Sequence, residues 1–305
     1  MRFKADLRHP QQFSRLIASL SPLGKIATLK LKPDAVHLIC MADGTKAGVQ
    51  VWRSVLPVVT ASLFDLDSLR LDSNHHNEIY LEVSLDALSR ALKSTYGATR
   101  VTIKLAKKGG SGPQGTGEGS YPVLSICVES SSRLGKKVEI VQDVAVRVKK
   151  AADLEQLTEP LCPAPEVIIS LPDMQGIRTV VERLKAISGY LTIRANNQGV
   201  LKIRAEADEA NVETEWRNLK RPQSGAEDIV ADVNDPSHFF KVTVEAKSLL
   251  KFLATYPVAS SAIACLCDDH CAIFYVYIGQ SKDRVEGGVL TFFVPAVKLD
   301  GDDDA

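Results

Sequence analysis

Two stretches of this chain change from the two-residue period of a strand to the spacing of a helix, with no glycine or proline between the two patterns. Residues 79–94, IYLEVSLDALSRALKS, first alternate apolar and polar positions and then place Leu85, Leu88 and Leu92 in one narrow sector of a helix. A similar stretch, VTVEAKSLLKFLAT, occupies residues 242–255. Both stretches therefore predict a strand that runs directly into an amphipathic helix.

The first 147 residues carry the pattern of one domain with eight or nine strands and two short helices. Phe13, Leu16, Ile17 and Leu20 predict the first helix, which ends at a Pro-Leu-Gly sequence, and residues 85–94 predict the second. Alternating runs predict strands at 2–7, 26–32, 35–41, 48–55, 77–83, 100–106, 121–129 and 136–146.

Beyond residue 147 the same order of patterns returns after a linker. Residues 148–165 contain three prolines and no sustained strand period, which is typical of an interdomain linker. The second domain, residues 166–298, then shows a strand, a helix, a hairpin with Asn196–Gly199 at its turn, a strand, a helix and three strands. Residues 299–305 form an acidic tail that we expect to be disordered.

The two halves also match in register, which is a stricter test than element order. At an offset of 164 residues, the apolar positions of the first helix fall on Ile177, Val180, Val181 and Leu184. At an offset of 161, Val83, Leu88, Arg90 and Leu92 fall on Val244, Leu249, Lys251 and Leu253. Two such matches in the same order indicate duplicated domains of similar fold, in the α+β class.

All four predicted helices carry basic residues away from their apolar side. This could be a nucleic-acid face, but any surface helix exposes lysine and arginine, so position alone does not decide. The residues are Arg15, Arg90, Lys93, Arg178, Arg183, Lys247 and Lys251.

Charge and composition limit the possible functions. The 305 residues are 45% apolar, enough for two cores, and 37 basic residues balance 37 acidic ones. The tail holds four aspartates, so the remainder carries about four net positive charges. A compact high-affinity DNA-binding protein is usually more basic, so any contact with DNA should be weak or shared with other chains. No apolar run is long enough for a membrane span or a secretory signal, and we expect no membrane partner.

The cysteines and glycines raise two possibilities for site chemistry. Cys265, Cys267, His270 and Cys271 could together bind zinc, but their spacing better fits buried thiols beside a hairpin turn at Asp268–His270. The glycine-rich stretch 107–120 lacks the Gly-Lys-Ser/Thr ending of a phosphate loop and predicts a flexible hairpin loop. Residues 220–237 also predict a loop or a disordered segment. We therefore expect no metal and no cofactor.

Three stretches together resemble a known family. NEIYLEVSLDALSRALK, EPLCPAPEVIISLP and FFVPAV are similar to the Hus-one type subunit of the nine-one-one checkpoint clamp, a relative of the PCNA sliding clamps. The resemblance extends from the N-terminus to Val297. It implies two topologically similar clamp domains, with antiparallel sheets outside and two helices per domain on the inner face of a ring.

The resemblance also implies a function and partners. It implies a non-catalytic subunit that closes a heterotrimeric ring with two different sister subunits around double-stranded DNA in the nucleus. A clamp loader of the RFC type would load the ring, and checkpoint and repair proteins would dock near the linker. The basic helix residues named above would face DNA, because sequence-independent sliding requires weak phosphate contacts.

Edge strands would join the subunits by extending each sheet across the junction. The resemblance places these edges at residues 136–142 and 211–217. The interface residues would be Val138, Ile140 and Gln142 in the first domain and Val212, Thr214 and Trp216 in the second.

Two alternatives remain open from the sequence. The chain could be a protein–protein scaffold of the same fold that does not enclose DNA. It could also be a metal-dependent hydrolase that uses the cysteine-rich turn or His75 and His76, although no HExxH, nucleophile-elbow or Cys-x-x-Cys motif supports this.

Overall fold

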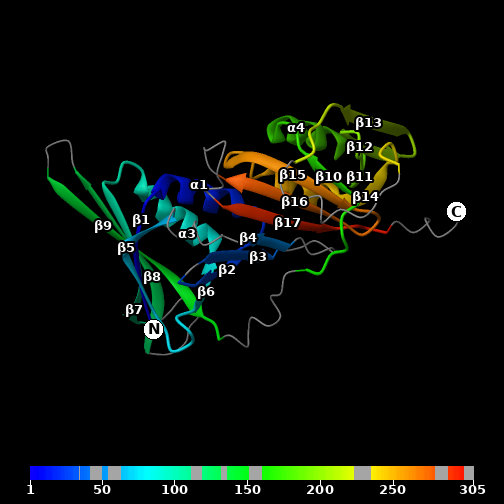
Figure 1. Ribbon diagram of the computed structural model, residues 1–305. Helices are drawn as coiled ribbons and strands as arrows, with labels where there is room; N and C mark the ends of the chain where they lie inside the picture. Colours follow the sequence, from blue (N-terminus) through cyan, green and yellow to red (C-terminus); the bar gives the residue numbers. More distant parts are fainter. Residues whose placement is uncertain are drawn as a thin grey trace. The chain divides into compact units, whose positions relative to one another are not determined.

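The computed structural model describes residues 1–33, 35–41, 50–53, 63–110, 119–131, 136–150, 160–222, 235–278 and 288–298. The chain divides into two compact units (Figure 1). Strands β1–β3 and β5–β9 belong to the first unit, and strands β10–β16 and β17 except for its first residue belong to the second. Strand β4 is divided between the two units. Each unit is described by itself below.

In the part of the first unit that the structure describes, two α-helices with defined bounds lie between strands. Its helices are α1 (Pro10–Leu20), α3 (Leu85–Leu92) and the short 3-10 helix η1 (Lys93–Thr95). The strands are β1 (Arg2–Leu7), β2 (Ile26–Leu31), β3 (Val36–Met41), β5 (Phe64–Asp72), β6 (Ile79–Ser84), β7 (Arg100–Gly110), β8 (Gly119–Ser131) and β9 (Lys137–Val148), and β4 comprises Gln50–Arg53.

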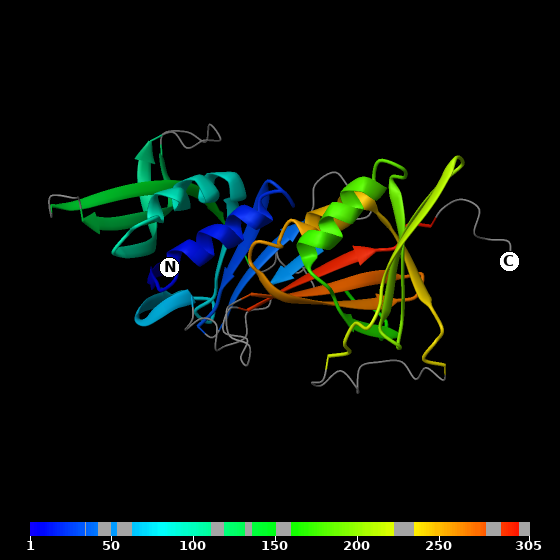
Figure 2. The ribbon, with the colours of Figure 1, turned by 90° about the horizontal axis from the view of Figure 1, so that it is seen from above.

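Strand β9 takes part in two antiparallel arrays of the first unit. The order β5-β1-β7-β8-β9 makes one array, and the order β3-β2-β6-β9 makes the other. Residues 137–145 of β9 pair with β8, whereas only its last three residues pair with β6. Helices α1 and α3 lie side by side (Figure 2), and the hydroxyl of Ser21 after α1 donates a 2.6 Å hydrogen bond to Asp86 of α3.

The second unit repeats the order of strands and helices. Its two antiparallel arrays have the orders β10-β15-β16-β17 and β13-β12-β11-β14, and helices α4 and α5 pack on each other. Its elements are β10 (Val167–Ser170), α4 (Met174–Leu184), β11 (Tyr190–Asn196), β12 (Val200–Ala207), β13 (Ala210–Trp216), β14 (Phe240–Glu245), α5 (Ala246–Leu253), β15 (Ala259–Cys267), β16 (Cys271–Ile278) and β17 (Val289–Pro295).

The same hydrogen bond fixes the strand-to-helix junction in both units. The backbone N–H of Leu85 donates to the carbonyl of Lys25, just before β2, at 3.0 Å. The N–H of Ala246 donates to the carbonyl of Gly189, just before β11, at 2.9 Å. These four residues are related by the offsets of 161 and 164 that the sequence predicted, so the repeat extends to individual backbone contacts.

Local side-chain chemistry explains where the helices begin. Ser84 accepts a hydrogen bond from the N–H of Ala87, and Asp173 accepts one from the N–H of Gly176 at 2.7 Å. Each cap satisfies an N–H group that has no partner within its helix. The predicted turns also form, because β11 ends at Asn196, β12 begins at Val200, and Asp268–His270 separate β15 from β16.

The structure corrects several element predictions. Strand β5 was not predicted, and α3 ends at Leu92 instead of residue 94. The sequence pattern of residues 173–189 predicts one helix, but α4 ends at Leu184, and Val180 is half-buried although it matches the buried Leu16 of α1. The predicted glycine-rich loop is shorter, since Lys107–Gly110 pair with Gly119–Pro122 as strands. Its interior at 111–118, residues 151–159 of the predicted linker, residues 223–234 and the tail at 299–305 lie outside the described residues.

Candidate nucleic-acid interface

Helices α1, α3, α4 and α5 each bury one side in their own unit. Phe13, Leu16, Ile17 and Leu20 of α1 are buried, and α4 buries Met174, Ile177, Val181 and Leu184. Helix α3 buries Leu85, Leu88 and Leu92, and α5 buries Leu249, Phe252 and Leu253. Burial of these rows sets the rotation of each helix and leaves its polar side toward solvent.

The polar sides of the helices are positively charged. Together with Lys93 and Lys185, which directly follow α3 and α4, the helices carry eight basic residues and two acidic ones, Asp86 and Glu182. The whole chain has a formal net charge of zero. Positive charge is therefore concentrated on these helices and balanced by acidic residues elsewhere.

Five of the seven predicted DNA-facing residues are exposed. Within the described parts of the chain, none of these five has an ion-pair partner, so their charge is open to solvent or to a ligand. The residues are Arg15, Arg90, Lys93, Arg183 and Lys247.

The other two predicted residues are less accessible. Arg178 forms an ion pair with Glu182 at 2.9 Å, and its guanidinium lies 5.5 Å from the centre of the Tyr256 ring. Lys251 is half-buried. A phosphate would have to compete with these contacts, so we expect Arg178 and Lys251 to contribute less to an anion-binding surface than Arg90 or Lys247.

Sequence reasoning missed Lys185. This residue still has helical dihedral angles (φ −59°, ψ −26°) and is exposed. Seven residues correspond to two helical turns, so Lys185 lies on nearly the same side of α4 as Arg178. The same angular calculation would have found it if the predicted helix had been examined beyond Leu184.

The two predicted interface strands expose backbone edges and apolar side chains. Within the described residues, the part of β9 from Lys137 to Asp143 pairs only with β8, and β13 is the last strand of its array. Val138 and Ile140 of β9 and Val212 of β13 are each 40% exposed. The remaining three predicted interface residues, Gln142, Thr214 and Trp216, are half-buried.

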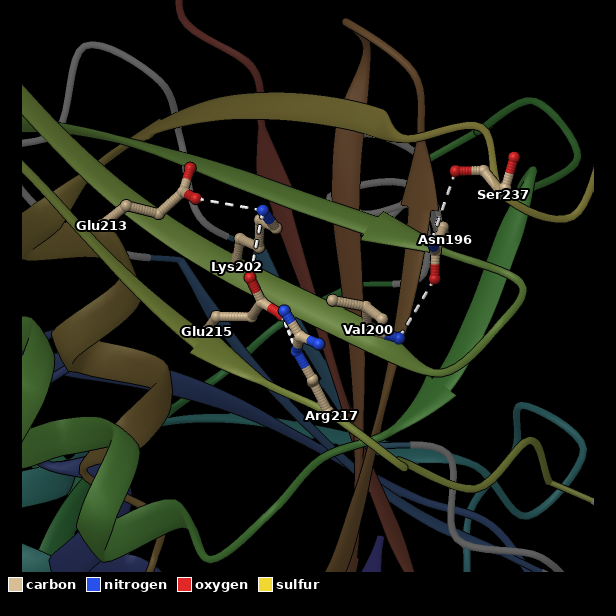
Figure 3. A network of polar contacts seen from close by, with 7 residues as sticks. All are labelled: Asn196, Val200, Lys202, Glu213, Glu215, Arg217 and Ser237. Atoms are coloured by element: carbon tan, nitrogen blue, oxygen red, sulfur yellow. Dashed lines mark hydrogen bonds and ion pairs between the residues drawn. The ribbon is translucent and has the colours of Figure 1, made fainter.

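A charge network holds β13 against β12 (Figure 3). Lys202 of β12 lies 3.2 Å from Glu213 and 3.1 Å from Glu215 of β13, and Glu215 also pairs with Arg217. Hydrogen bonds to Glu215 and Glu213 raise the pKa of Lys202. Nearby, Asn196 accepts a hydrogen bond from the N–H of Val200 at 3.1 Å, which closes the β11–β12 turn. Strand β13 is thus an ordered edge.

Comparison with known proteins gives one consistent family. The model of the Hus1-like protein family matches residues 1–298. The chain is 30% identical to the Checkpoint protein hus1 of Schizosaccharomyces pombe over 96% of its own length and 98% of that protein. It is 28% identical to the Checkpoint protein HUS1 of Homo sapiens, over 97% and 100% of the two chains.

The chain belongs to the Hus1-like protein family. A relative in Dictyostelium discoideum, named Checkpoint protein hus1 homolog, is 22% identical over 97% of this chain. The family resemblance and the PCNA-like clamp fold that the sequence predicted are confirmed.

Other features of this Hus1-like chain bear on the alternatives. In the parts of the chain that the structure describes, no group of three or more histidine, cysteine, aspartate or glutamate side chains is arranged to hold a metal. Burial raises the pKa of Cys265 to about 12, which is the behaviour of a core thiol. The longest described helices have 11 residues, and none is long and apolar enough to cross a membrane.

Proposed function

We propose that this chain is a non-catalytic subunit of a heterotrimeric, ring-shaped checkpoint clamp that encircles double-stranded DNA and recruits checkpoint and repair factors. The observation that carries the proposal is the concentration of basic side chains on helices α1, α3, α4 and α5 of a chain whose net charge is zero. Membership of the Hus1-like family supports it, because the three relatives reported above are all named checkpoint proteins.

The basic helix residues suit a ring that holds DNA without reading its sequence. Long side chains such as Arg90 and Lys247 contact phosphates, which look alike along the whole duplex. Retention then comes from closure of the ring, and electrostatic attraction only centres the duplex. A few exposed cations per subunit are enough for this purpose, whereas a single strongly basic patch would hinder sliding.

Two different sister subunits would complete the ring through the edges of β9 and β13. Unpaired N–H and C=O groups on these edges can continue the sheet into a neighbour, and Val138, Ile140 and Val212 would lose their exposure there. In this proposal the two clamp domains comprise residues 1–147 and 166–298, joined by the linker at 148–165. A clamp loader of the RFC type acts on the ring in the nucleus, and checkpoint and repair proteins dock near the linker.

The experiment compares charge reversals on the helices with matched reversals elsewhere. The test variant is Arg90→Glu with Lys247→Glu, one residue from each unit. The control is Arg70→Glu with Lys298→Glu, which are also exposed and also come one from each unit. Binding of the assembled heterotrimer to plain duplex DNA is measured over a salt series, with assembly checked by light scattering after size exclusion.

The test variant should assemble normally and bind DNA more weakly. Loss of two phosphate contacts should reduce the slope of log K against log salt by roughly two units, at about 0.9 per contact, whereas the control should keep the wild-type slope. An intact heterotrimer whose slope does not change would refute DNA enclosure. The second candidate function, a scaffold that does not enclose DNA, would then be favoured by the exposed edges of β9 and β13.

A further inference from the structure

Three of the six cysteines lie together in the second unit, although they are far apart in the sequence. Cys267 and Cys271 are directly opposite each other at the end of the β15–β16 hairpin. Cys162 precedes β10, and the Cys271 thiol hydrogen-bonds to both Cys267 and Cys162. None of the three is part of a disulfide. We call Cys162, Cys267 and Cys271 the thiol cluster.

Hydrogen bonds to the chain around Cys162 fix its position in the cluster. The Cys267 thiol donates to the carbonyl of Pro163 at 3.4 Å, and the N–H of Glu166 donates to the carbonyl of Leu266 at 3.0 Å. The N–H of Asp268 donates to the Glu166 carboxylate at 3.0 Å. The residues just before β10 therefore lie along the end of the hairpin, and Cys162 is held beside Cys271.

Access to the three thiols is unequal. Cys267 is 0% and Cys271 4% exposed, whereas Cys162 is half-exposed. A small dissolved reagent can therefore reach Cys162 first. The hydrogen bond from Cys271 lowers the pKa of Cys267, and the same bond raises the pKa of Cys271.

We propose that Cys162 and Cys271 form a reversible disulfide that fastens the residues before β10 to strand β16, with a low-molecular-weight disulfide as oxidant. In the first step the Cys162 thiolate attacks one sulfur of the oxidant. The oxidant's S–S bond breaks, one half stays bonded to Cys162, and the other half leaves as a thiolate that takes up the proton lost by Cys162.

In the second step Cys271 attacks the sulfur of Cys162. The bond between Cys162 and the retained half of the oxidant breaks, and that half leaves as a thiolate that takes up the proton lost by Cys271, so two protein thiols are oxidised and one small disulfide is reduced to two thiols. Reversibility is expected where the surroundings are reducing, because disulfides there are transient and respond to oxidants.

The test treats the full-length chain with oxidised glutathione, blocks remaining thiols by alkylation and maps disulfides by mass spectrometry. Wild type should lose two of its six alkylatable thiols and yield a peptide pair joined through Cys162 and Cys271. The melting temperature should rise, since the bond closes a long loop, and a reductant should reverse both changes.

Three single variants separate the steps. Cys271→Ser should stop at the mixed disulfide on Cys162, because the resolving thiol is gone, and Cys162→Ser should form no internal disulfide. Cys127→Ser is the matched control and should react like wild type. Cys127 lies on β8 in the first unit, outside the thiol cluster, and its thiol donates a hydrogen bond to the Glu139 carboxylate. A Cys267–Cys271 disulfide in Cys162→Ser, or a persistent mixed disulfide in wild type, would overturn the proposal.

Discussion

Truncation of Phe252 to alanine should destabilise the second unit by roughly 4 kcal/mol. The Phe252 side chain on α5 is 1% exposed and lies between two other rings. It stacks on Phe274 of β16 at a centroid distance of 4.2 Å and meets Phe292 of β17 edge to face at 5.3 Å. This cluster fastens α5, and with it Lys247, to the strands beneath it.

The expected magnitude has two contributions. Removal of a buried phenylalanine side chain costs about 3–5 kcal/mol, because apolar area is lost and the surrounding structure refills the cavity only partly. Each aromatic pair stabilises the fold by about 0.5–1.5 kcal/mol beyond the burial of its rings. The range of about 3–5 kcal/mol for removal of a phenylalanine side chain already includes part of this energy. Domains of this size are stable by only about 5–15 kcal/mol, so the change should be large relative to the total.

Urea denaturation can follow the second unit separately. The chain contains two tryptophans, so in a Trp52→Phe background Trp216 on β13 is the single fluorescent reporter of that unit. The control is Leu250→Ala in the same background, since Leu250 is on the same helix but half-exposed. Phe252→Ala should lower the unfolding midpoint with an unchanged slope, by far more than the control. Equal losses in the two variants would refute the ring cluster as the main attachment of α5.

Two further predictions concern backbone fit and pH. Gly199→Ala should lower the free energy of unfolding by about 1–3 kcal/mol, because Gly199 has a φ of +82° and an added Cβ would lie 2.3 Å from the carbonyl oxygen of Leu219. Gly189→Ala is the control, because the space around Gly189 is open, and it should change the free energy of unfolding by less than about 1 kcal/mol. Thermal melts of the two variants measure both changes. Burial alone would raise the pKa of Asp6, but hydrogen bonds from Thr102 (2.5 Å) and Arg100 (2.6 Å) outweigh it and lower that pKa below the ordinary 3.8. The ionised Asp6 carboxylate therefore contributes to the free energy of unfolding above pH 3.8, and this contribution is lost as the pH falls through the lower folded-state pKa. In denaturant titrations the stability difference between wild type and Asp6→Asn should shrink below pH 3.8. A difference that stays constant would contradict this account.

Strand β5 shows why part of the fold could not be predicted from periodicity. Its partner β1 pairs Lys4 with Arg70 but Asp6 with Asp65, so a bulge interrupts the register. The Ser68 hydroxyl fills that bulge, donating to the carbonyl of Asp65 at 2.7 Å and accepting from the N–H of Asp6 at 2.8 Å. A bulge breaks the two-residue alternation on which the prediction depended.

The candidate site was predictable only where contacts are local. The basic side of α3 and the ion pair of Arg178 with Glu182 four residues later follow from helix geometry. The thiol cluster does not follow from spacing, because Cys162 reaches Cys271 only through the packing of the chain before β10 along β15. Sequence spacing suggested a different set, with Cys265 and His270, whereas the structure groups Cys162 with Cys267 and Cys271.

The direct strand-to-helix junctions explain how α3 and α5 each keep their basic residues on the side away from the core of their own unit. Val83 of β6 is buried, and α3 begins two residues later at Leu85. The backbone N–H of Leu85 donates a hydrogen bond to the carbonyl of Lys25. Because no loop separates the strand from the helix, the alternation of the strand fixes the rotation of the helix, and Arg90 must then lie opposite Leu88 and Leu92. The junction at Ala246 does the same for Lys247 in the second unit. The positions of these cations therefore depend on buried apolar residues and backbone hydrogen bonds, and total charge need not be high for the helices to present a positive surface.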